Sequence, residues 1–292
     1  MKHTKVAIIG VGNVGASAAF ALLLSDVISE IILVDACTEK SAGQAKDLND
    51  ARAFTQASLV RQGTYADACT ADIIVICAGK PQLPGQSREE LVQANAQVIH
   101  GICAQLTSLS SEAIVIMVTN PLDAMTYLAQ QLLPISKNRI FGTGTWLDTQ
   151  RLRRFLAEHF NVSPQSIEAF MLGEHGDSAV AIVPSYLSLS PQEIERFQQM
   201  VIREAYAIIK LKCATYYGIA MCIRDICNAI IHNQRRVLPL SAYQHEFDIC
   251  ISVPVIVGEN GIEATVPIAL TAREEDLFKR SIGAIQKTLK SL

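Results

Sequence analysis

A histidine, a carboxylate and two arginines in this sequence could act together on a small anionic molecule. His175 lies in the glycine-bounded stretch GEHGDS, and Asp148 and Arg151 lie three residues apart in GTGTWLDTQRLR, so a helix would place both on one face. Arg88 ends the polar stretch AGKPQLPGQSR, which follows a short apolar run. A titratable imidazole and fixed cations suit a reaction that creates or removes charge on an oxygen beside a carboxylate, as hydride transfer does.

Each of these residues also has a purely structural interpretation. A histidine in a loop is most often only solvated, and Asp148 with Arg151 could be a surface pair on a helix. Asn120, in the stretch TNPLD, could serve only the turn before Pro121. Several of these residues follow apolar runs, however, and a doubly wound sheet binds its ligands at the carboxyl ends of its strands.

The stretch IIGVGNVG predicts a dinucleotide site that includes Gly10, Gly12, Val14 and Gly15. The three glycines have G-x-G-x-x-G spacing between an apolar run and a helical pattern, where free N–H groups would receive a pyrophosphate. Asp35 lies twenty residues after the last glycine, where a carboxylate would bind the ribose 2′-OH and repel a 2′-phosphate. No arginine follows it closely, so NAD is predicted rather than NADP. The alternative is a glycine turn without a ligand.

The first half of the chain alternates short apolar runs with helical patterns. Continuous β-branched runs are typical of strands that are buried on both faces. The pattern predicts an α/β fold with a Rossmann-type doubly wound parallel sheet. Strands are expected at 5–9, 30–35, 57–61, 72–77, 113–118 and 139–141, with helices near 14–26, 38–53, 88–108 and 122–133.

The second half has a different pattern, which predicts a mixed α+β substrate domain built after the parallel sheet. We therefore expect an NAD-binding domain at 1–142 and a catalytic, substrate-binding domain at 143–292. No linker rich in Pro, Gly or Ser separates them, so they should pack tightly. Expected elements are a helix at 146–160, a strand at 166–172, a helical stretch at 191–232, strands at 236–241, 248–253 and 262–266, and a helix at 273–290.

The composition limits the partners and the compartment. Of 292 residues, half are apolar and 18% are charged, so much surface must be buried in a core or against another subunit. The net charge of −3 gives no reason to expect nucleic acid or an anionic membrane. No apolar run is long enough to span a membrane, and glycines interrupt the stretch that superficially resembles a signal peptide. Eight cysteines without C-x-x-C spacing indicate reduced thiols in a cytoplasmic protein and no metal site.

Six ordered motifs resemble those of the NAD-dependent L-lactate/L-malate dehydrogenase family, closest to its bacterial L-lactate dehydrogenase branch. They are GVGNVG, AGKPQLPGQSR, TNPLD, GTGTWLDTQR, GEHGDS and CATYYGIA, and the resemblance covers nearly the whole chain. It implies an oxidoreductase of fermentation that uses NAD, acts on a small 2-oxo or 2-hydroxy acid, and forms a homotetramer or homodimer.

The resemblance also implies a role for each matching residue. His175 would take the proton from the lactate hydroxyl and return it in pyruvate reduction, and Asp148 would orient its ring. Arg151 would clamp the substrate carboxylate through two parallel hydrogen bonds, and Arg88 would polarise the carbonyl when its loop closes. Further contacts are implied for Asn120 near the reacting oxygen and the cofactor, for Thr215 in the substrate pocket, and for Ile219, one helical turn on, against the nicotinamide.

Thr215 and Ile219 could instead belong only to the core, since they lie in a very apolar stretch. The stretch YYGIAMCI, which includes Ile219, could equally serve a subunit interface.

Gln82 is the residue on which the predicted substrate depends. In the family, the matching position is typically glutamine in lactate enzymes and arginine in malate enzymes, because oxaloacetate brings a second carboxylate that needs a cation. Pyruvate is therefore expected over oxaloacetate. The chain is shortened between Ser185 and Val201, which could open the pocket to larger 2-oxo acids, so malate or a bulkier substrate remains an alternative. An inert NAD(H)-binding sensor is a third alternative, although such a protein would need neither the His–Asp pair nor the arginines.

The resemblance also bears on regulation. Arg153 matches an arginine that some bacterial relatives use, with a histidine, to bind an activating sugar bisphosphate between subunits. Glu168 occupies the position of that histidine, where a carboxylate would repel phosphate. We therefore expect no activation by fructose 1,6-bisphosphate. The sequence leaves open the physiological direction and the choice between dimer and tetramer.

Overall fold

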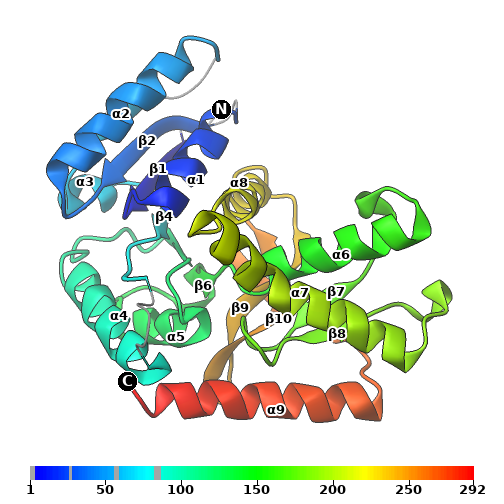
Figure 1. Cartoon of the computed structure of the whole chain (residues 1–292). Coiled ribbons are helices and arrows are strands. Elements are labelled where there is room, and N and C mark those ends of the chain that lie inside the picture. The colour runs from blue at the N-terminus through cyan, green and yellow to red at the C-terminus, as the bar shows by residue number, and fades with distance from the viewer. Residues whose placement is uncertain (1–3, 26–27, 56–58, 82–86) are drawn as a thin grey trace.

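The structure is a computed structural model that describes residues 4–25, 28–55, 59–81 and 87–292 (Figure 1). Within these residues, a nine-stranded sheet has the order β11-β10-β9-β6-β5-β4-β1-β2-β3. Six of its strands run parallel, in the expected doubly wound order 3-2-1-4-5-6. They are β1 (Thr4–Ile9), β2 (Ile28–Val34), β3 (Leu59–Gln62), β4 (Ile73–Ile76), β5 (Ile114–Met117) and β6 (Ile140–Gly142).

Helices cover both faces of this sheet, because successive strand residues point to opposite sides. In β1, Val6 and Ile8 enter one core cluster and Ala7 and Ile9 enter another. The helices that follow the strands are α1 (Asn13–Leu23), α2 (Thr38–Arg52), α3 (Tyr65–Ala68), α4 (Arg88–Cys103) and α5 (Leu122–Leu132). The first cluster lies under α1 and α2, and the second lies under α3, α4 and α5.

Three strands from the second half continue the same sheet, which differs from the expectation that this half is built apart from it. They are β9 (Arg236–Gln244), β10 (Ile249–Gly258) and β11 (Gly261–Thr265), all antiparallel to their neighbours. The junction is the pairing of Gly142 with Ser241. A Cβ on Gly142 would lie only 3.0 Å from that of Ser241, so glycine permits the close approach. The division at 142/143 stays a prediction about how the chain is organised.

The remaining α-helices and strands form a smaller layered unit, one helix over the parallel sheet and a long edge helix. They are α6 (Trp146–Phe160), β7 (Phe170–Leu172), β8 (Val180–Ile182), α7 (Pro191–Lys212), α8 (Tyr217–Ile231) and α9 (Ala272–Leu289). A core cluster joins α6, the β7–β8 hairpin and α7, whereas α8 packs on α1 and covers the first face of the parallel sheet. In Figure 1, α9 runs along one edge of the molecule and contacts α5, β10 and β8.

Two expectations for the second half are wrong in detail. Only the last three residues of the expected strand 166–172 are extended, and the strand β8 was not foreseen. The helical stretch 191–232 is two helices, because Cys213 ends α7 in a left-handed conformation with a φ of 67°. Thr215 therefore lies in the connection between α7 and α8, and the helical turn expected between it and Ile219 does not exist. No helix within the described residues is long and apolar enough to cross a membrane.

Candidate active site

The loop that carries His175 is fixed to two other elements. Gly173 donates its N–H to the Ser252 carbonyl at 2.9 Å and accepts the Ser252 N–H at 3.0 Å, which ties the loop to β10. A φ of +93° and the lack of room for a Cβ beside Ser281 require glycine at this position. The buried Glu174 donates its N–H to Ser281 Oγ at 2.5 Å, which ties the loop to α9.

His175, Asp148 and Arg151 form one connected group. The imidazole Nδ1 lies 2.7 Å from Asp148 Oδ2, and Arg151 donates from Nη1 to Asp148 Oδ1 at 3.1 Å. Asp148 lies in the first turn of α6 and Arg151 one turn later, and both are buried, so they are not a solvated surface pair. The structure therefore brings together these three residues, which come from segments far apart in the sequence.

The charges in this group decide the protonation of the imidazole. Burial lowers the pKa of His175, but the charge and hydrogen bond of Asp148 outweigh burial, and the net pKa is raised. Burial likewise raises the pKa of Asp148, but His175 and Arg151 outweigh it, and the net pKa is lowered. The arrangement thus favours an imidazolium beside a carboxylate. The imidazolium can give its Nε2 proton to an acceptor.

Arg151 can bind a further anion in addition to its pairing with Asp148. Within the described residues, its guanidinium has no hydrogen-bond partner other than Asp148. The remaining N–H groups of this planar fork match the geometry of a carboxylate.

Asn120 lies at the carboxyl end of β5, where its side chain is exposed and its backbone carbonyl accepts a hydrogen bond. Asn95 of α4 is buried, and its amide donates to the Asn120 carbonyl at 2.7 Å and to the Lys80 carbonyl at 3.2 Å. The Asn95 amide oxygen accepts the Lys80 N–H at 2.7 Å. Asn95 therefore fixes the start of the 78–88 segment to the strand end. Sequence reasoning missed it, although an asparagine on the apolar face of an expected helix was a signal.

The 78–88 segment carries two further predicted site residues, Gln82 and Arg88. Gln82 and the Arg88 side chain lie outside the described part of the chain, so their roles stay predictions. Arg88 is the first residue of α4, which Ser87 caps by accepting the Glu90 N–H at 3.1 Å.

The glycines of the first βα turn leave a surface that fits a dinucleotide. Gly10 has a φ of +90°, and a Cβ there would collide with Ala78 at the end of β4, where the strand order reverses. A Cβ on Gly15 would collide with the Gly10 carbonyl, so glycine allows α1 to start close to the strand. Space remains open around Gly12: among the residues that the structure describes, only the Lys40 ammonium lies within 4 Å of a Cβ position, at 3.8 Å. This open backbone at the start of α1 suits a pyrophosphate.

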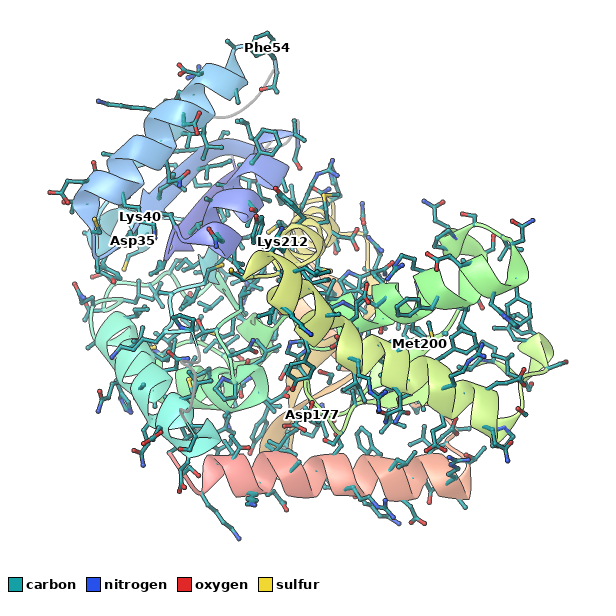
Figure 2. The ribbon with its side chains drawn as sticks, viewed as in Figure 1. Asp35, Lys40, Phe54, Asp177, Met200 and Lys212 are labelled. Atoms are coloured by element: carbon teal, nitrogen blue, oxygen red, sulfur yellow. The ribbon has the colours of Figure 1, made fainter. Side chains whose placement is uncertain are left out.

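Asp35 follows β2 and is fixed by two backbone groups. Its oxygens accept the Val11 N–H at 2.8 Å and the Cys37 N–H at 3.0 Å. Lone pairs remain on both oxygens for a ribose hydroxyl. Lys40, which sequence reasoning missed, lies 4.0 Å from Asp35 Oδ2, and Figure 2 shows the two side by side. A cation therefore stands beside the carboxylate that was expected to exclude a 2′-phosphate.

The last predicted contacts lie on or near α1, α7 and α8. Val14 of α1 and Ile219 of α8 are partly buried against the same core cluster. Thr215 is half-buried in the α7–α8 connection. The Tyr206 hydroxyl of α7 donates to Asp177 of the histidine loop at 2.9 Å, so α7 contacts that loop. The roles of Val14, Thr215 and Ile219 stay predictions.

The Arg153 side chain contacts neighbouring residues of its own chain. Its Nε donates to the Ala169 carbonyl at 3.0 Å, and its guanidinium lies 5.3 Å from the ring centres of Trp146 and Phe170. Glu168 is exposed nearby and adds a negative charge. The expected absence of fructose 1,6-bisphosphate activation stays a prediction.

The parallel sheet is doubly wound, and an open glycine turn lies where its strand order reverses. The chain also has a His–Asp–Arg group. Together these features define a nucleotide-dependent dehydrogenase. The sequence model for the lactate/malate dehydrogenase NAD binding domain matches residues 4–142, and that for the alpha/beta C-terminal domain of the same family matches residues 145–292. The chain belongs to the lactate/malate dehydrogenase family, and its cofactor is NAD.

Relatives match over the full length. An L-lactate dehydrogenase of Borrelia turicatae is 36% identical over all of this chain and 99% of its own. L-lactate dehydrogenase A of Rhizopus oryzae is 37% identical over 97% of this chain and 92% of its own. The crystal structure of a minor L-lactate dehydrogenase from Enterococcus mundtii superposes with a TM-score of 0.94 at 35% identity, covering 100% of this chain and 99% of that one.

Proposed function

We propose that the protein is an L-lactate dehydrogenase that interconverts pyruvate and L-lactate with NAD(H). The observation that carries this proposal is the His175–Asp148 contact of 2.7 Å through Nδ1, with Arg151 on the same carboxylate. It leaves Nε2 as the ring nitrogen for the substrate's oxygen, next to a guanidinium for the substrate's carboxylate. An inert NAD(H)-binding protein would need neither group.

The side chains divide the work of pyruvate reduction. Arg151 binds the substrate carboxylate and thereby orients the carbonyl. Bound NADH supplies the hydride. As negative charge develops on the carbonyl oxygen, His175 gives its proton from Nε2 to that oxygen, and Asp148 stabilises the imidazolium beforehand. In lactate oxidation, the neutral imidazole takes the proton back. Arg88 and Asn120 are assigned to the same oxygen.

The choice of lactate rests on Gln82 and on relatives that are named L-lactate dehydrogenase. A neutral amide tolerates the methyl group of pyruvate, whereas oxaloacetate would bring an unpaired carboxylate into the site. Malate or a bulkier 2-hydroxy acid is the second candidate, favoured by the short segment between Ser185 and Val201.

A panel of 2-oxo acid substrates tests the proposal. The protein is mixed with NADH and with pyruvate, oxaloacetate or a longer 2-oxo acid, and the loss of NADH absorbance is followed. Pyruvate should give the highest kcat/KM. A higher value for oxaloacetate or a longer acid would move the assignment to the second candidate, and no turnover with any 2-oxo acid would favour an NAD(H)-binding protein.

Gln82→Arg should shift the preference from pyruvate toward oxaloacetate. The new cation would pair with the second carboxylate, and such a charge-assisted bond contributes about 1.5–3 kcal/mol, or roughly ten- to a hundredfold in the kcat/KM ratio. The measurement is kcat/KM for both acids in the variant and the wild type. An unchanged ratio would remove Gln82 from substrate selection.

Asp35→Ser should weaken the preference for NADH over NADPH by about tenfold or more, because it removes the repulsion of a 2′-phosphate and leaves Lys40 to bind it. Adding Lys40→Ala to this variant should reverse the gain, whereas Lys46→Ala, an exposed lysine on the same helix, should not. Kinetics with both cofactors measure the ratios. Equal effects of the two lysine changes would show that Lys40 acts only through general charge.

The chain's surface and thiols support a cytoplasmic homo-oligomer, dimer or tetramer. The packed helices α1 and α8 present Phe20, Tyr217 and Met221 to solvent, and Leu24, which caps the end of α1, is also exposed. All eight cysteines lie in the described part of the chain and are free thiols, which is typical of a protein in a reducing compartment.

A further inference from the structure

The loop that carries His175 contacts a serine of the C-terminal helix. Ser281 lies near the middle of α9 and is completely buried. Its hydroxyl accepts the backbone N–H of Glu174 at 2.5 Å and lies 3.1 Å from the Ser178 hydroxyl. The Ser178 hydroxyl in turn donates to Glu174 Oε2 at 2.5 Å. These three hydrogen bonds form a closed network, the Ser281 network, which joins α9 to loop residues on either side of His175.

The direction of each bond in the Ser281 network follows from the protons that its members carry. A backbone amide donates, and a carboxylate oxygen accepts. Ser178 has one hydroxyl proton and donates it to Glu174, so its oxygen must accept from Ser281. Ser281 therefore accepts the Glu174 N–H and donates its own O–H to Ser178. Because each hydroxyl donates once and accepts once, the loss of either one leaves two partners without a bond.

The strand β10 supports both the loop and the helix that contacts it. Ile251 of β10 packs in a buried cluster with two isoleucines of α9. The next residue of the strand, Ser252, exchanges two backbone hydrogen bonds with Gly173, which precedes Glu174. Since β10 fixes the helix and the start of the loop, Ser281 can hold the Glu174 amide in a constant position.

The position of the catalytic imidazole depends on contacts from several helices. The N–H of His175 donates to Asp123 of α5 at 2.8 Å, and the imidazole Nδ1 lies 2.7 Å from Asp148 of α6. A rotation of the loop about these contacts would move Nε2, the atom that carries the proton, away from the substrate. The Ser281 network opposes such a rotation, because it holds the residue before His175 and the residue three positions after it.

We propose that Ser281 is a positioning residue for the catalytic histidine and that it acts through Glu174 and Ser178. The closed network fixes the base of the loop, so that the His175 proton meets the substrate oxygen at a constant place. Catalysis depends strongly on such placement, since a shift of about 1 Å can lower a rate by about 10²-fold. Ser281 lies outside all six motifs of the sequence, so this role depends on the packing of α9.

Ser281→Ala removes the central hydroxyl of the network. The Glu174 amide then loses its acceptor and Ser178 loses its donor, so the loop is less firmly held. We expect kcat for pyruvate reduction to fall by about 10- to 100-fold. KM for pyruvate and the dissociation constant of NADH should stay near the wild-type values, because other elements hold Arg151 and the glycine turn. Steady-state kinetics and a fluorescence titration with NADH measure these quantities.

A double-mutant cycle with Ser178→Ala tests whether the two hydroxyls act through one network. Ser178→Ala opens the network but leaves Ser281 to accept the Glu174 N–H, so its kcat should fall less than that of Ser281→Ala. In the double variant, Ser178→Ala should lower kcat by a much smaller factor than it does alone, because the network is already open. Factors that multiply would show two independent contributions and would overturn the proposal.

Ser25→Ala is the matched control for the loss of a buried hydroxyl. Ser25 is also a buried serine that joins two elements, since its oxygen accepts the Nε–H of Arg224 on α8 at 3.1 Å. It follows the carboxyl end of α1, whereas the glycine turn precedes the amino end. This variant should lower Tm but keep the wild-type kcat.

Two results with the Ser281 variant would also overturn the proposal. One is a wild-type kcat in the folded Ser281→Ala protein. The other is a parallel loss of kcat, pyruvate affinity and NADH affinity, which would indicate a general loosening of the fold. If Ser281→Ala does not fold, Ser178→Ala decides the question, because Ser178 is only partly buried. An unchanged kcat in that folded variant would then refute the role of the network.

This inference rests on the proposed function, but the two can fail separately. A wild-type enzyme that reduces no 2-oxo acid would refute the function. A wild-type enzyme that reduces pyruvate, with Ser281→Ala and Ser178→Ala variants that keep its kcat, would refute only the role of the Ser281 network.

Discussion

Replacing His175 with asparagine is expected to lower kcat for pyruvate reduction by about 10²- to 10⁴-fold, the usual contribution of a positioned acid or base. Asparagine can still donate a hydrogen bond to Asp148, but it has no ring nitrogen that could give a proton to the substrate. The loss should therefore fall on kcat, and NADH binding should be unaffected. Steady-state kinetics and a fluorescence titration with NADH measure the two quantities.

His100→Asn is the control for this change, because His100 is exposed in the last turn of α4. It should keep wild-type rates. The expected residual activity of the His175 variant is far lower than a tenth of the wild-type kcat. A variant that retains more than about a tenth would show that another group donates the proton.

The raised pKa of His175 also fixes the direction of the pH dependence. Reduction needs the protonated ring, so kcat/KM for pyruvate should stay level through the ordinary value of 6.5 and fall only at higher pH. Oxidation of lactate needs the neutral ring and should rise over the same range. Asp148→Asn should move both limbs to lower pH, because the carboxylate that holds the imidazolium charge is lost.

Local patterns were sufficient to predict the parallel sheet. Four of its six strands, β1, β2, β4 and β5, are short runs rich in β-branched residues, and such runs are extended because both faces are covered. The break between α7 and α8 had no such signal. Helices commonly end at a left-handed glycine, but here Cys213 has the positive φ, so the sequence reads as continuous helix.

The continuation of the sheet by β9 could not be predicted from local patterns. It depends on the contact between Gly142 and Ser241, which lie about a hundred residues apart, and no periodicity encodes a pairing at that separation. The same limit applies to the site. Motifs identified His175, Asp148 and Arg151 as candidates, but only the folded chain places them within hydrogen-bond distance.

Residues that support the site from behind were harder to predict than those within the motifs. Asn95, Lys40 and Asp123 are ordinary polar residues in helical patterns, and their partners come from other segments. Asp123 even lies within TNPLD, yet nothing in that motif indicates that its carboxylate reaches the backbone of a residue 52 positions later.

Replacing Arg151 with lysine is expected to raise KM for pyruvate by about 30-fold or more, since weakening one partner of a buried, hydrogen-bonded charge pair costs about 2–5 kcal/mol. Lysine keeps the charge beside Asp148 but replaces a planar fork with a single ammonium, so one of the two parallel bonds to the substrate carboxylate is lost. Keeping the charge also limits the effect on His175, whose pKa Arg151 lowers. Arg154→Lys is the control, because Arg154 lies on the same helix but pairs with Glu158 and Glu204.

The assignment of Arg151 to the carboxylate, rather than to the general fit of the substrate, can be tested with pyruvamide. This neutral amide has the same ketone and methyl group but no anionic carboxylate. If Arg151 binds the carboxylate, the lysine variant should lose most of the wild-type discrimination between pyruvate and pyruvamide, because only the charged substrate uses both arms of the guanidinium. Longer 2-oxo acids carry the same carboxylate and should be weakened by a factor close to that for pyruvate. An equal loss for pyruvamide and pyruvate would instead mean that Arg151 acts through Asp148 and His175, on the proton rather than on the substrate.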